Sequence, residues 1–181
     1  MDGESSIRKA YEAILSGDFE QALARFEEAI ALEPDQGVHY YKCSITCARS
    51  GKWQKALHYA EQAVALEPAQ EEYRFHLQTV QSRWRVIEAE ALLSREGTEG
   101  EKAIAMLCDA IRLDPLNLDA LLILGAAYAA RNRFEEAAVC AKDALRLDPE
   151  HSAARRLLAD VRRSRLALRT YKQRRQRKRN R

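Results

Sequence analysis

Four windows of equal length decide the fold: ALARFEEAIALEP (22–34), ALHYAEQAVALEP (56–68), AIAMLCDAIRLDP (103–115) and AAVCAKDALRLDP (137–149). Each window ends in a proline, and these prolines are Pro34, Pro68, Pro115 and Pro149. The first and last intervals between them are equal, and the middle interval is longer by an insertion of 13. A fixed period of about 34 residues is typical of stacked helical hairpins, because a single hairpin cannot bury its apolar face alone.

Each window predicts the second helix of a hairpin. In the first window Ala22, Phe26 and Ala29 follow one another at steps of four and three, which places them on one helical face. The alanines let a paired helix approach closely, because they carry no bulky side chain. Gly17 breaks the chain before this helix, and Pro34 disfavours helical geometry in its predecessor and so ends the hairpin.

The pattern resembles the tetratricopeptide repeat, a helix–turn–helix unit of the same period. The segment 118–130 matches the first-helix pattern of that family best, through Leu121, Leu124, Gly125 and Tyr128. The resemblance implies an all-α helical-hairpin solenoid with about four repeats, a long central helix and a C-terminal capping helix. We expect the repeats at 3–36, 37–70, 84–117 and 118–151, inside a repeat domain over 1–160.

The insertion between the second and third windows predicts one long helix. No proline or glycine occurs between Pro68 and Gly97. Apolar residues recur there at steps of four and three, namely Tyr73, Leu77, Val80, Trp84, Ile87 and Ala91. One continuous helix of about 25 residues explains this spacing better than two short helices. Pairing of two such helices through the Trp84 stripe would give a self-associating protein, an alternative that the sequence leaves open.

The C-terminal part combines a helical cap with a basic extension. Ala154, Leu157, Val161 and Leu168 have helical spacing and predict a cap for the open end of the stack. After Asp160 there are no acidic residues, and eleven lysines and arginines give residues 161–181 a charge of +11. The net charge of +3 then leaves −8 for residues 1–160. Beyond Tyr171 the chain has no apolar residue, and we expect disorder there.

The resemblance also implies a concave groove, lined by the first helix of each hairpin, that holds a partner peptide or helix. Carried over by register, the groove residues are Ile7, Tyr11, Ile14, Val38, Tyr41, Lys42, Ile45, Arg49 and Leu122. Their apolar side chains favour an apolar or amphipathic segment, with Lys42 and Arg49 orienting its acidic groups. Co-chaperones of this family clamp a C-terminal carboxylate with a lysine and asparagines, but the corresponding positions here are Ile7, Tyr11 and Lys42. This chain therefore lacks the clamp.

Catalytic and metal sites are not indicated. There is no glycine-rich phosphate loop, nucleophile elbow or HExxH motif, and we expect neither enzyme activity nor a cofactor. His39, Cys43 and Cys47 recur every four residues, which a zinc site could use. No CxxC motif is present, however, and the two cysteines occupy packing positions, so the sequence favours buried thiols over a metal site.

The basic extension supports an alternative function, association with nucleic acid or the ribosome. Its candidate residues are Arg169, Lys172, Arg174, Arg175, Arg177, Lys178 and Arg179. Such a cluster neutralises phosphates without base specificity, and it suits an acidic protein, an anionic lipid surface or nuclear import equally well. A solvated tail without a partner is the competing interpretation. The sequence shows no signal peptide and no apolar run of about 18 residues, which predicts a cytoplasmic protein, or a nuclear one in a eukaryote.

Overall fold

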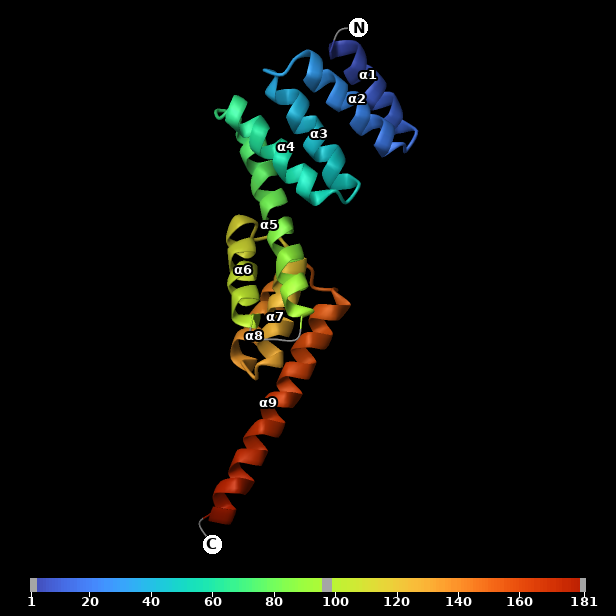
Figure 1. Cartoon of the computed structure of the whole chain (residues 1–181). Helices are drawn as coiled ribbons and strands as arrows, with labels where there is room; N and C mark the ends of the chain where they lie inside the picture. Colours follow the sequence, from blue (N-terminus) through green and yellow to red (C-terminus); the bar gives the residue numbers. More distant parts are fainter. Residues whose placement is uncertain (1–2, 96–98, 180–181) are drawn as a thin grey trace. The chain divides into compact units, whose positions relative to one another are not determined.

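The computed structural model of the chain describes residues 3–95 and 99–179. Within those ranges it contains nine α-helices and no strand (Figure 1). The chain divides into two compact units, Met1–Trp84 and Arg85–Arg181, which we call the first and second units. The all-α repeat architecture predicted from the sequence is thereby confirmed.

The first unit consists of two helical hairpins and the beginning of a fifth helix. Its helices are α1 (Gly3–Leu15), α2 (Phe19–Leu32), α3 (Gly37–Arg49), α4 (Trp53–Leu66) and the start of α5 (Glu71–Leu93). The first residues of α1, α3 and α5 are evenly spaced, and the same interval separates the first residues of α2 and α4. This interval equals the one between Pro34 and Pro68. The period seen in the sequence is thus the hairpin itself.

Short polar and glycine turns separate the helices of each hairpin. Asp18 caps α2, and its side chain accepts a hydrogen bond from the backbone N–H of Gln21. Gly17 and Gly51 precede α2 and α4 with φ of 80° and 75°, a left-handed conformation that strains other residues. Two consecutive helices can therefore reverse direction within a few residues and pack against each other.

Small residues dominate the core of the first unit. Ala22 and Ala56 have no exposed surface, which brings the helix backbones close together. Phe26 is 1% exposed and is the largest fully buried side chain of the described residues. It packs in one cluster with Ala10, Cys43 and several other apolar side chains. The alanine-rich face predicted from the sequence is therefore the buried face.

The long central helix is confirmed as α5, which has 23 residues. Its first half belongs to the first unit, where Tyr73 and Val80 are buried. Its second half belongs to the second unit, where Val86 and Ala89 have no exposed surface. In this half the residues of the predicted spacing are not the buried ones, because Trp84 and Ile87 are half-buried and Ala91 is exposed. A single spacing rule fails here because the two halves of α5 pack into different cores.

The second unit repeats the hairpin plan and ends in a long helix. After the second half of α5 come α6 (Gly100–Leu113), α7 (Leu118–Ala130), α8 (Phe134–Leu147) and α9 (Ser152–Arg179). Asn117 caps α7 by accepting a hydrogen bond from the N–H of Ala120. A Cβ atom on Gly125 of α7 would stand 2.8 Å from a methyl carbon of Leu157, so the glycine permits close packing of α7 and α9.

Helix α9 is both the predicted cap and an unexpected extension of it. Ala154 and Val161 are buried against the rest of the second unit, which confirms the cap. The disorder expected beyond Tyr171 is wrong for residues 172–179, which continue α9 to Arg179. Arginine, lysine and glutamine all have high helix propensity, and no glycine or proline interrupts them.

Candidate functional site

The first helices of successive hairpins present equivalent positions in the first unit. Because α1, α3 and α5 begin at one constant interval, Ile7, Tyr41 and Phe75 share one position of the repeat. Tyr11 and Ile45 share a second position, one helical turn further along. We call these five residues the first-helix face. It contains four of the groove residues predicted from the sequence, and Phe75 in addition.

Tyr41 lies at the centre of this face but is 7% exposed. Its ring stacks on Tyr73 of α5, with centroids 4.6 Å apart and an interplanar angle of 26°. The Tyr41 hydroxyl donates a 2.6 Å hydrogen bond to Glu72 Oε1. Burial, with the carboxylate of Glu72 nearby, raises the pKa of the Tyr41 phenol far above its usual value. Helix α5 thus covers the residue that the sequence suggested as an anchor for a partner.

A second polar contact fixes α5 on α3. The Ser44 hydroxyl donates to the carbonyl oxygen of Ala56 over 2.7 Å, and His76 Nε2 lies 2.8 Å from the Ser44 oxygen. Because the hydroxyl proton is already committed, His76 must donate from Nε2, which places a proton on that nitrogen. Burial lowers the pKa of His76, and Glu72 opposes that shift only in part. His76 is therefore a neutral structural contact at pH 7.

We predict that the first unit loses stability as the pH falls below about 6.5, the ordinary pKa of histidine. In the unfolded chain His76 then takes up a proton, whereas the folded form with its lowered pKa resists it. The measurement is urea unfolding between about pH 7.5 and pH 5 with the His76→Gln variant as comparison. The amide of glutamine keeps a donor for Ser44 but does not titrate. An equally steep pH dependence in the variant would contradict this assignment.

Tyr11 and Phe75 are the accessible aromatic residues of the first-helix face. Tyr11 is 42% exposed and meets Phe26 edge-on, with ring centroids 5.9 Å apart. Phe75 is 67% exposed. The sequence analysis missed Phe75, although its place one full repeat period after Tyr41 was the signal that could have identified it. Exposed aromatic rings of this kind are frequent anchors for protein partners.

The remaining predicted groove residues are distributed unevenly. Ile7 and Ile14 are half-buried against the core of the first unit, and Ile45 is half-buried beside Tyr41. The Lys42 ammonium lies 5.4 Å from the centre of the Tyr41 ring, and the Arg49 guanidinium 5.6 Å from that of Phe19. Val38 of α3 is half-buried as well. Leu122, half-buried on α7, belongs to the second unit and is not part of this face.

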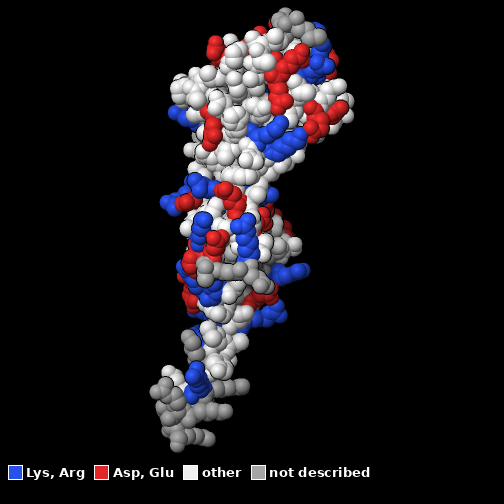
Figure 2. All heavy atoms as spheres, viewed as in Figure 1, with Lys and Arg blue, Asp and Glu red and all other residues white. Residues whose placement is uncertain are grey.

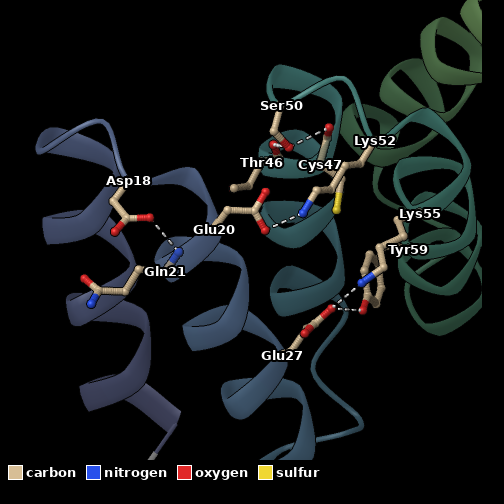
Figure 3. A network of polar contacts seen from close by, with 10 residues as sticks. All are labelled: Asp18, Glu20, Gln21, Glu27, Thr46, Cys47, Ser50, Lys52, Lys55 and Tyr59. Carbon is tan, nitrogen blue, oxygen red and sulfur yellow. Dashed lines mark hydrogen bonds and ion pairs between the residues drawn. The ribbon is translucent and has the colours of Figure 1, made fainter.

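A network of polar contacts joins α2 and α4, the second helices of the two hairpins in the first unit (Figure 3). Glu27 of α2 accepts hydrogen bonds from the Tyr59 hydroxyl at 2.8 Å and from Lys55 at 3.3 Å, both on α4. Glu20 and Lys52 form a second bridge of 2.5 Å. Burial, followed by the bond to Glu27, raises the pKa of Tyr59 well above its usual value. Hydrogen bonds and ion pairs thus join these side chains between two hairpins, which indicates a structural network rather than a catalytic one.

The residues weighed as a metal site are structural too. Cys43 and Cys47 have no exposed surface and pack in the core, while His39 Nε2 lies 2.9 Å from Glu33 Oε2. Among the described residues, no group of three histidine, cysteine or acidic side chains is arranged to hold a metal ion. The same part of the chain contains no helix long and apolar enough to cross a membrane.

The second unit has a concave apolar groove of its own, with a volume of about 390 Å³. Side chains of α6, α7 and α8 form it. Its lining residues are Cys108, Ile111, Arg112, Leu121, Leu124, Tyr128, Glu136, Val139, Cys140 and Asp143. Burial raises the pKa of Cys140 to about 11, so the thiol stays protonated and unreactive at pH 7.

Only part of the predicted basic cluster can be located. Arg169 and Arg175 are exposed on α9, while the side chains of Lys172, Arg174, Arg177, Lys178 and Arg179 lie outside the described residues. Elsewhere on the face shown in Figure 2, acidic and basic side chains are interspersed within each unit. The body of the protein therefore presents no uniformly basic face in this view. By sequence, the excess of positive charge follows Asp160, on α9.

Comparisons with known proteins agree with this geometry. Residues 118–151, from the start of α7 to the loop before α9, match the tetratricopeptide repeat family. The solved structure of MamA 41-end from Desulfovibrio magneticus RS-1 aligns with a TM-score of 0.55 and 18% identity, over 90% of this chain and 85% of that chain. A crystal structure of MamA protein aligns with a TM-score of 0.54 and 18% identity, over 88% and 80%. No curated protein sequence matches the chain.

Proposed function

We propose, since the chain has the tetratricopeptide-repeat fold and a matching repeat at residues 118–151, that it is a non-enzymatic scaffold for protein–protein interaction. Stacked hairpins of this kind expose long surfaces but few convergent polar groups, which suits binding better than catalysis. The Tyr41 and Tyr59 hydroxyls donate hydrogen bonds to Glu72 and Glu27 of neighbouring helices, so these groups are engaged with one another.

The partner-binding surface in this proposal is the first-helix face. The observation that carries it is the exposure of Tyr11 and Phe75 beside half-buried Ile7 and Ile45. An apolar or amphipathic peptide segment would gain most from covering these side chains. Tyr41 supports this surface from below through its stack on Tyr73, and it makes no direct contact in the proposal.

We expect the double variant Tyr11→Ser, Phe75→Ser to lose at least about tenfold in affinity for the partner, because exposed aromatic anchors dominate such interfaces. The partner is first captured from a lysate of the source organism with the unaltered chain. It is then purified, and its affinity for each variant is measured by calorimetry. Circular dichroism checks that helicity is retained.

Leu116→Ser is the matched control, since Leu116 is 73% exposed and lies between α6 and α7 in the second unit. It should leave the affinity unchanged. Equal affinity of the double variant and the control would refute the first-helix face as the binding surface. A chain truncated after Tyr171, which keeps the cap residues Val161 and Leu168, and a nuclease-treated lysate complete the comparison. Loss of the partner in either would assign binding to the basic extension instead.

A further inference from the structure

The two units contain the same series of helices. For α2 to α5, the same number of residues separates the start of each helix from the start of its counterpart in the second unit. The corresponding first residues are Phe19 and Gly100, Gly37 and Leu118, Trp53 and Phe134, and Glu71 and Ser152. Helices α2, α3 and α4 therefore correspond to α6, α7 and α8, and α5 corresponds to α9. The correspondence extends to packing, because Val80 of α5 and Val161 of α9 are both buried caps of their units.

Helix α5 has a second role once it passes Trp84. Val86 and Ala89 have no exposed surface and pack in one cluster with Ala103, Ile104 and Leu107 of α6. The second half of α5 is thus the first helix of a hairpin, and α6 is its second helix. A long helix in this series therefore caps one unit and is also the first helix of the next unit.

Helix α9 has the length for both roles, but of the described side chains in its second half only Leu168 packs on the core, and the opposite face is uncovered. Figure 1 shows its last turns extending beyond α7 and α8. Ala167 and Thr170 occupy the positions in α9 that Val86 and Ala89 have in α5, and both are exposed. With Leu166, 64% exposed, and Tyr171, 62% exposed, they form a stripe at helical spacing. We call these four residues the outer stripe.

The charges beside the outer stripe are positive, apart from Asp160, which lies N-terminal to the stripe and pairs with Arg163. Arg162 and Arg169 are exposed along one edge of it, and Arg175 is exposed at the other. Arg165 lies 3.0 Å from Glu135 of α8, and no acidic residue follows Asp160. A helix packed on this stripe would bring its flanking residues next to arginines, so acidic flanks would be attracted and basic flanks repelled.

We propose that the outer stripe of α9 binds an amphipathic helix of a partner protein whose apolar face is flanked by acidic residues. The partner helix would complete between two proteins the hairpin that α5 and α6 form within this chain. Leu166 and Tyr171 favour a helix over a nucleic acid, because phosphates would gain nothing from apolar side chains. The proposal is independent of the first-helix face.

The test uses a synthetic peptide with the α6 sequence Gly100–Leu113, in which Lys102→Glu and Arg112→Glu supply acidic flanks and Cys108→Ser removes the thiol. A lactam bridge from Glu101 to the new side chain of Ala105→Lys keeps it helical, because both native side chains there are exposed. Its binding to the full chain is followed by fluorescence anisotropy. We expect Leu166→Ser, Tyr171→Ser to weaken binding at least about tenfold. Raising the salt concentration should weaken it as well.

The matched control is Leu15→Ser, Leu116→Ser, which removes two apolar side chains elsewhere, 88% and 73% exposed, and should bind the peptide like the parent. Binding that is unchanged in the stripe variant would overturn the proposal. So would no binding up to about 1 mM peptide. Displacement of the peptide by a short single-stranded DNA that binds both variants equally would also overturn it, and would identify a polyanion site on α9.

Discussion

Replacement of Phe26 by alanine is expected to lower the free energy of unfolding of the first unit by about 3 to 5 kcal/mol. The Phe26 ring is 1% exposed and contacts the edge of Tyr11, with centroids 5.9 Å apart. Its removal would leave a cavity among helices whose other core residues are mostly small, so neighbouring side chains cannot fill the space. Urea denaturation followed by tryptophan fluorescence measures the loss, because both tryptophans lie within Met1–Trp84.

Leu107→Ala provides a matched comparison, because Leu107 occupies the position in α6 that Phe26 has in α2 and has no exposed surface. It should lower the stability of the second unit by about 2 to 5 kcal/mol, seen in circular dichroism. A Trp84→Phe background leaves Trp53 as a reporter of the first unit. If Phe26→Ala cost less than about 1 kcal/mol in that background, the packing of the first unit would be looser than described.

The sequence predicted the repeats well because their determinants are local. Gly17, Asp18 and Pro34 set the ends of helices within a few residues of themselves, and the alanines that recur every hairpin mark its buried face. The same local rules predicted α5 as a single helix. Period and helix type therefore follow from short-range spacing, and the structure confirms both.

The accessible surface could not be predicted in the same way, because it depends on what covers each helix. Tyr41 has the register of a groove residue, yet the stack on Tyr73 removes it from solvent. Tyr73 lies in the insertion, where the sequence predicts a helix but not the core into which that helix packs. Ala91 is exposed for a related reason. The second half of α5 packs into a different core, and one periodic stripe of apolar residues cannot describe two cores.

Replacement of Arg85 by proline should destabilise the chain by about 3 kcal/mol or more, because proline removes a hydrogen bond and clashes with the preceding turn of α5. We expect the loss in both units. Val80, before the break, caps the first core, whereas Val86, after it, has no exposed surface in the second core. Trp53 fluorescence reports the first loss, and circular dichroism reports both.

Arg85→Ala is the control for the lost side chain, and it should cost little because alanine favours the helix. The comparison separates two descriptions of α5. If α5 were two helices that merely abut near residue 85, proline would be tolerated there, since the first turn of a helix accepts it. A loss for Arg85→Pro no larger than for Arg85→Ala would therefore contradict the continuous helix. A large loss in both readouts means that one helix must stay unbroken to serve as the cap of one unit and the first helix of the next.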